Sequence, residues 1–204
     1  MNKLASIDFL QALGLPTIFP EVIRDTSEKK VRARVKSFYY NHEPGWVLRC
    51  AEPPESDRPV ERGLPWDMAQ GKDELIEKVL AMQREVGSGY LVFCHPAKEM
   101  IRGGVMLIEG NRVVVDSATG GPRELSAFYR GYRSPEQTIV FNPGMLSQQR
   151  YGREVLHRSD LLDIRTIERT LNWGELDAIS DPVCVEFSFL KGGELYVHDL
   201  STVK

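Results

Sequence analysis

Apolar residues recur at helical spacing in four parts of the chain. Residues 72–86 carry their apolar side chains on one face, and the Gly87 that follows is a common helix end. That face consists of Leu75, Ile76, Val79, Leu80 and Val86. The same periodicity predicts a helix over residues 3–13, a second that follows a capping box of Asp25 and Glu28 and ends near residue 41, and a third that Ser159 caps and that extends to residue 171. A shorter helical turn is expected over residues 125–129.

Short apolar stretches bounded by Gly, Pro and polar residues predict strands between these helices. They are residues 17–23, 46–51, 90–94, 104–108, 112–116, 138–141, 183–189 and 194–197. Two pairs are joined by tight loops, residues 109–111 and 191–193, and should form antiparallel hairpins. Because several neighbouring strands have no helix between them, we expect an α+β fold rather than a doubly wound parallel sheet. It would be one domain over residues 1–204, with two lobes of mostly antiparallel sheet, residues 1–87 and 88–204, and flanking helices.

Composition narrows the classes of protein that this chain can represent. Its 204 residues are 42% apolar and 27% charged, which is typical of a globular protein. The net charge of −3 gives no overall positive field to attract nucleic acid or an anionic membrane, so neither is expected as a partner. Residues 1–13 lack the layout of a signal peptide, and we expect a cytoplasmic protein. Three widely spaced cysteines, never in a C-x-x-C pair, favour reduced thiols over disulfides or a thiolate zinc site.

Two positions carry side chains suited to phosphate or metal chemistry. Arg49 lies near the end of the strand over residues 46–51, and its planar guanidinium suits phosphate oxygens. Glu186 lies on the polar face of the strand over residues 183–189, and His198 on the next strand can reach that face. A carboxylate and an imidazole there can hold a divalent ion. The alternatives are a solvated arginine at a sheet edge and a sheet with one solvated face.

Other candidates are less specific. His95 follows the strand over residues 90–94, where a linker can pass beside the edge of an adenine ring; a strand-end histidine in a turn is the alternative. Gly63 and the pair Gly120 and Gly121 can offer backbone N–H groups to phosphate, but neither stretch matches a known phosphate-binding loop motif. The sequence has no H-E-x-x-H and no G-x-S-x-G, which argues against zincins and serine hydrolases.

Taken in order, several segments resemble the nucleotide-binding domain of ATP-grasp proteins. The segments are KLASIDFLQALGLP, WVLRCAEPPESD, ERGLPW, DELIEKVLAM, YLVFC, IRGGVMLI, DSATGGPRELSAFYRG, LLDIRTIERTLNW and PVCVEFSFLKGGELYVHDL. The order is most similar to the form of this domain at the front of pyruvate phosphate dikinase and phosphoenolpyruvate synthase. The phosphorylated-histidine domain and the pyruvate-binding barrel of those enzymes have no counterpart here, so we do not expect the full dikinase reaction from this chain.

The resemblance implies roles for individual residues. Those matched to the nucleotide site are Lys3, Arg49, Gly63, Phe93, Cys94 and His95; those matched to catalysis are Arg49 and Glu124; those matched to the metal site are Glu186 and His198. Cys50 and Ala51 stand where the family prefers serines, and His198 stands where it has a glutamine.

The resemblance leaves two functions open. One is an ATP- and Mg²⁺-dependent enzyme of the phosphotransferase or ligase kind, in which Mg²⁺ and Arg49 offset charge on a transferring phosphoryl group. Its acceptor would be a small molecule or a partner protein. The other is a degenerate, non-catalytic binding or assembly module that works with a protein partner or a separate subunit.

Overall fold

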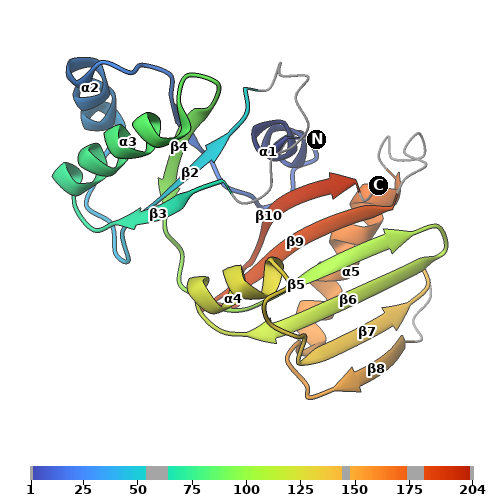
Figure 1. The fold of residues 1–204 in the computed structure, drawn as a ribbon. Coiled ribbons are helices and arrows are strands. Elements are labelled where there is room, and N and C mark those ends of the chain that lie inside the picture. Colours follow the sequence, from blue (N-terminus) through green and yellow to red (C-terminus); the bar gives the residue numbers. More distant parts are fainter. Residues whose placement is uncertain (1, 54–63, 144–147, 174–181, 203–204) are drawn as a thin grey trace. The chain divides into compact units, whose positions relative to one another are not determined.

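The computed structural model describes residues 2–53, 64–143, 148–173 and 182–202 (Figure 1). The chain forms two compact units. We call Asn2–Ala5 with Ile18–Lys98 the N-terminal unit, and Ser6–Thr17 with Glu99–Lys204 the C-terminal unit. The main boundary follows Lys98 rather than Gly87, because the strand between these two positions pairs within the N-terminal unit.

The N-terminal unit contains a four-stranded antiparallel sheet in the order β1-β4-β2-β3. Its strands are β1 (Glu21–Ile23), β2 (Trp46–Ala51), β3 (Trp66–Ala69) and β4 (Leu91–Pro96). The helices α2 (Glu28–Phe38) and α3 (Lys72–Val86) pack against one face of this sheet (Figure 1). The core between them contains Val31, Val35, Leu48, Leu75, Ile76, Val79, Val92 and Cys94. Because side chains alternate along a strand, Arg49 and His95 belong to the opposite face.

The C-terminal unit contains a six-stranded antiparallel sheet in the order β10-β9-β5-β6-β7-β8. Its strands are β5 (Met100–Glu109), β6 (Arg112–Thr119), β7 (Gln137–Phe141), β8 (Gln148–Gly152), β9 (Val183–Leu190) and β10 (Leu195–Thr202). Figure 1 shows α4 (Pro122–Tyr129) and α5 (Arg158–Trp173) on opposite sides of this sheet. The side of α5 holds the core, to which Leu10 of α1 (Lys3–Ala12) also contributes.

A β-bulge interrupts the pairing of β10 with β9. Val197 lies opposite Phe187, and the next pair is Asp199 with Glu186, so His198 is the extra residue. Without the bulge, strict alternation would put Asp199 on the same side as the core residue Val197. The bulge instead brings Asp199 to the face that carries Glu186.

The structure confirms the expected α+β fold with two mostly antiparallel sheets and flanking helices. Residues 46–51 and 72–86 have the predicted boundaries, whereas β3 and β8 were not anticipated. Leu80, expected in the core, is only partly buried, and Met82 is buried instead. All three cysteines are free thiols. Among the described residues, no helix is both long and apolar enough to cross a membrane.

Candidate functional site

The helix-free face of the N-terminal sheet brings Arg49 and His95 together. In the antiparallel register Arg49 lies opposite Phe93 and Val47 lies opposite His95. Arg49 and His95 are therefore diagonal neighbours on one face, a relationship that separates residues by roughly 7–8 Å. Arg49 is half-buried in the middle of the sheet, between β3 and β4, so it is not the edge-strand arginine of the alternative interpretation.

Lys3 is held near the end of β2 by its neighbour Asn2. The Asn2 Oδ1 atom accepts a hydrogen bond from the Ala5 backbone N–H at 2.9 Å, which caps the start of α1. The Asn2 side-chain amide donates to the carbonyl oxygen of Pro53 at 3.0 Å, two residues beyond β2. One asparagine thus ties the first turn of α1 to the segment that follows β2, a link that sequence reasoning missed.

His95 is a neutral histidine among cations. Burial and the nearby positive charges of Arg49, Lys3 and Lys98 lower its pKa to about 3, although a hydrogen bond with Pro96 opposes the shift. All of these groups belong to the N-terminal unit. Lys3, Arg49 and His95, which the sequence singled out, thus belong to one unit together with Lys98, and their role at a nucleotide site stays a prediction.

The other residues expected at the nucleotide site have different positions. Phe93 lies on the face of Arg49, fully buried, with its ring stacked on His95 at a centroid distance of 6.5 Å. Cys94 points to the helix side and lies in the core, where burial raises the pKa of its thiol, so only its backbone can contribute to the opposite face. Gly63 lies outside the described residues.

In the C-terminal unit, Glu186 faces a carboxylate rather than the expected imidazole. The bulge in β10 places Asp199 directly opposite Glu186, and both side chains are partly exposed. Directly opposed residues have their Cβ atoms roughly 4.5–5.5 Å apart, and like charges at that distance destabilise a sheet. Asp199 also accepts a hydrogen bond from the Leu200 N–H at 3.0 Å.

His198 lies on the same face but is engaged by a hydroxyl network. The Tyr129 hydroxyl donates its single proton to the carbonyl oxygen of Phe187 at 2.7 Å. The Ser188 hydroxyl must therefore be the donor in its 2.8 Å hydrogen bond with the Tyr129 oxygen. The remaining partner of Ser188 Oγ is His198 Nε2 at 2.8 Å, which must then donate its proton. A protonated Nε2 has no lone pair for a metal ion. Gly103 leaves room for this network, since a Cβ there would collide with the Tyr129 hydroxyl.

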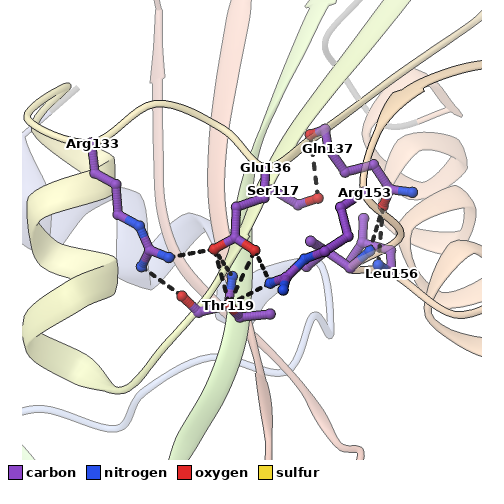
Figure 2. A network of polar contacts seen from close by, with 8 residues as sticks. Ser117, Thr119, Arg133, Glu136, Gln137, Arg153 and Leu156 are labelled. Carbon is purple, nitrogen blue, oxygen red and sulfur yellow. Dashed lines mark hydrogen bonds and ion pairs between the residues drawn. The ribbon is translucent and has the colours of Figure 1, made fainter.

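Glu124 and Glu136 lie near each other in the chain but have different surroundings. Glu124 is exposed in the first turn of α4, where the helix dipole favours a negative charge. Glu136 lies between the guanidinium groups of Arg133 and Arg153 and accepts a hydrogen bond from Thr119 Oγ1 at 2.9 Å (Figure 2). Burial opposes ionisation of Glu136, but the hydrogen bonds from Thr119 and Arg153 lower its pKa overall. Glu136 thus fixes the segment between α4 and β7 to the end of β6.

Arg49 belongs to the N-terminal unit and Glu186 to the C-terminal unit. Across the part of the chain that the structure describes, no group of three or more His, Cys, Asp or Glu residues is placed to hold a metal ion.

Comparisons with known proteins identify the fold of this chain. No family model matches the sequence, and no curated protein matches it. D-alanyl-alanine synthetase A from Vibrio cholerae is similar in structure, with a TM-score of 0.58 and 10% identity over 98% of this chain and 54% of that protein. D-Alanine-D-alanine ligase from Helicobacter pylori has a TM-score of 0.57 and 10% identity, and the match covers 100% of this chain and 51% of that ligase. N5-carboxyaminoimidazole synthetase from Staphylococcus aureus has a TM-score of 0.56 and 9% identity, and the match covers 100% of this chain and 44% of that synthetase.

This chain has the ATP-grasp fold. It spans about half the length of the ligases and synthetases that it matches. At these identities the likeness establishes the ATP-grasp fold alone. The finer resemblance to the dikinase and synthase form of the domain stays a prediction.

Proposed function

We propose that this protein binds Mg-ATP and transfers a phosphoryl group to an acceptor, with Arg49 and Lys3 contacting the phosphates and Glu186 and Asp199 binding the metal ion. The ATP-grasp fold supports a nucleotide ligand. Among similar structures, carboxyaminoimidazole ribonucleotide synthase from Aspergillus clavatus was solved with ATP and the Staphylococcus aureus synthetase with ADP.

The observation that carries the proposal is the cationic cluster on the N-terminal sheet. Arg49 is a diagonal neighbour of His95 on one face of the sheet, Asn2 ties the start of α1 to the segment after β2, and the charges of Lys3 and Lys98 also act on His95. A guanidinium can bind two phosphate oxygens at once, while an ammonium acts as a point charge. A polyphosphate is the ligand class that matches several converging cations. Because the whole chain carries a net charge of −3, attraction for an anion would come from this local cluster and not from the overall charge of the protein.

The opposed carboxylates of the C-terminal unit suit Mg²⁺. This ion is usually bound through one or two carboxylates together with substrate phosphates, and Glu186 and Asp199 supply that number. When bound, Mg²⁺ would supply neutralisation of charge on the transferring phosphoryl group. The catalytic role of Glu124 stays a prediction from the resemblance, and its exposed position at a helix start gives it an ordinary structural role as well.

A non-catalytic binding module is the second candidate function. The family's serines after the phosphate-binding arginine correspond here to Cys50 and Ala51, both buried. Burial and the charge of Glu85 raise the pKa of the Cys50 thiol to about 11, so this position offers neither a hydroxyl nor a thiolate. Loss of such groups favours retention of ligand binding without turnover.

Thermal unfolding of the full chain tests the proposal. Mg-ATP at one hundred times its dissociation constant should add about 2.7 kcal/mol to the free energy of unfolding, and adenosine at the same concentration should add much less. No shift at millimolar Mg-ATP would exclude nucleotide binding. Release of ADP over a panel of carboxylate and amine acceptors then separates an enzyme from a binding module.

A further inference from the structure

His95 carries a buried nitrogen atom whose hydrogen bond is missing. Its side chain is 5% exposed on the cationic face of the N-terminal sheet, with Phe93 stacked beside it. The Nδ1 atom lies 3.1 Å from the carbonyl oxygen of Pro96. Among the described residues, the Nε2 atom is buried and has no hydrogen-bond partner. A buried polar atom without a partner costs about 1–3 kcal/mol, so it needs a physical explanation.

The tautomer of His95 follows from its neighbours. A carbonyl oxygen can only accept a hydrogen bond, so Nδ1 must carry the proton that it donates to Pro96. Burial and the charges of Arg49, Lys3 and Lys98 keep the ring neutral, because they lower its pKa to about 3. A neutral imidazole has one proton, and Nε2 is therefore a hydrogen-bond acceptor. Only a ligand or solvent group that donates a proton can satisfy it.

This requirement selects one part of a nucleotide. Phosphate oxygens are acceptors and are repelled by the Nε2 lone pair, so they belong with Arg49 and Lys3 rather than with His95. The 6-amino group of adenine is a donor, whereas guanine and hypoxanthine present a carbonyl oxygen at the same position.

We propose that Nε2 of His95 accepts a hydrogen bond from the 6-amino group of the bound adenine nucleotide, so that His95 selects adenine over 6-oxopurines. This inference rests on the proposed function. It makes His95 a specificity-determining residue that acts through its side chain, and it assigns the unpartnered nitrogen a partner of defined chemistry. An oxopurine would bring an acceptor against an acceptor and leave both unsatisfied.

Calorimetric titration of the full chain with three Mg-nucleotides tests the proposal. Wild-type protein should bind ATP at least about tenfold more tightly than inosine triphosphate, the penalty expected for one unpaired buried acceptor, and should bind 2′-deoxyATP as it binds ATP. His95→Phe removes the acceptor and keeps an aromatic ring, so its affinities for ATP and inosine triphosphate should become equal. His95→Gln keeps an acceptor and should retain part of the preference. His157→Gln changes an exposed histidine of the C-terminal unit and is the matched control.

The outcomes separate this inference from the proposed function. If the wild-type protein binds none of the three nucleotides, the proposed function fails. If it binds ATP but His95→Phe keeps the wild-type preference, only the role of His95 fails. Weaker binding of 2′-deoxyATP that disappears in His95→Phe would assign the donor to the ribose and overturn the choice of the base.

Nitrogen NMR of histidine-labelled wild-type protein gives a test that needs no variant. The Nε2 resonance of His95 should move upfield when ATP is added and stay in place with inosine triphosphate, as expected for an acceptor that gains a donor only from adenine. An Nε2 resonance that ATP leaves unchanged would overturn the proposal.

Discussion

Arg102 of β5 and Asp160 of α5 form a buried, two-pronged ion pair. The Arg102 Nε and terminal nitrogen donate to the two carboxylate oxygens of Asp160 at 2.9 and 2.8 Å, and the side chains are 13% and 3% exposed. His157 is the residue before α5, and its backbone N–H donates a hydrogen bond to Asp160 at 2.8 Å. One carboxylate thus caps α5 and joins this helix to the sheet. Ser159, the cap expected from the sequence, lies inside the helix instead.

Removing one partner of this pair should be costly. Asp160→Asn keeps the shape of the side chain but leaves the Arg102 charge buried, and we expect a loss of about 3–5 kcal/mol in the free energy of unfolding. Urea denaturation measures it, with an unchanged m value. Glu99→Gln at the exposed pair of Lys191 with Glu99 is the control and should cost at most about 0.5 kcal/mol. Equal small losses in both variants would contradict a buried, mutually dependent pair.

The apolar face of α3 should dominate the stability of the N-terminal unit. Leu75 is fully buried between α3 and the sheet, and Leu75→Ala should cost about 2–5 kcal/mol through lost burial and a residual cavity. Glu77→Ala, on the exposed face of the same helix, should change stability by less than about 0.5 kcal/mol. Chemical denaturation of both variants checks this. A loss below 1 kcal/mol for Leu75→Ala, by the same scale, would mean that the site is not packed as the structure has it.

Acid should destabilise the protein through His95. Its pKa falls from an ordinary 6.5 to about 3 in the fold, so the unfolded chain takes up a proton below pH 6.5 while the folded chain does not. Titration of His95 therefore leaves the free energy of unfolding unchanged well above pH 6.5 and lowers it progressively as the pH falls from 6.5 toward 3. Between pH 7 and 5 the wild-type protein should lose about 2 kcal/mol more than His95→Gln. Above pH 7 the two stability curves should run parallel, and curves parallel down to pH 5 would contradict a neutral buried ring.

The sequence was sufficient to predict elements with strong periodicity. Residues 46–51 and 72–86 combine a clear apolar pattern with flanking Gly or Pro, and both segments have the expected boundaries. The strand β8 (Gln148–Gly152) was missed because it is polar and mostly exposed and is held at the sheet edge by pairing with β7 alone. Backbone pairing of this kind leaves no hydrophobic pattern to detect.

The candidate site was predictable only in part, for two physical reasons. Lys3, Arg49 and His95 were singled out from the sequence, but the cap that Asn2 forms and its link to Pro53 depend on three-dimensional proximity. A single extra residue in β10 reverses the side of the sheet for every position after it. Regular alternation therefore drew attention to His198 and away from Asp199.

Arg49→Lys should separate charge from geometry at the phosphates. Lysine keeps the positive charge but loses the planar fork, so affinity for ATP should fall about tenfold while adenosine binds as before. Arg84→Lys, an exposed position of α3, is the control and should leave both affinities unchanged. Calorimetry with ATP, ADP and adenosine measures the effect. Unchanged ATP affinity in Arg49→Lys would remove this residue from the phosphate site.

The proposed metal site can be tested with variants that distinguish His198, the ligand expected from the sequence, from Asp199, the residue paired with Glu186. If Glu186 and Asp199 bind Mg²⁺, Glu186→Gln and Asp199→Asn should each weaken the Mg²⁺ dependence of ATP binding, because each removes an anionic oxygen while keeping the side-chain shape. His198→Gln should leave that dependence nearly unchanged, since His198 Nε2 donates to Ser188 rather than to a metal. Glu194→Gln, an exposed carboxylate in the turn between β9 and β10, is the control.

ATP titrations over a range of Mg²⁺ concentrations give the slope that distinguishes these variants. A flattened slope in both carboxylate variants, with wild-type slopes in His198→Gln and Glu194→Gln, is the result expected from the bulged register. Loss of the Mg²⁺ dependence in His198→Gln together with a wild-type response in Asp199→Asn would return the ligand role to the imidazole. In that case either Nδ1 of His198 would bind the metal, or the Ser188 hydrogen bond would break, because Nε2 cannot donate a proton and coordinate an ion at the same time.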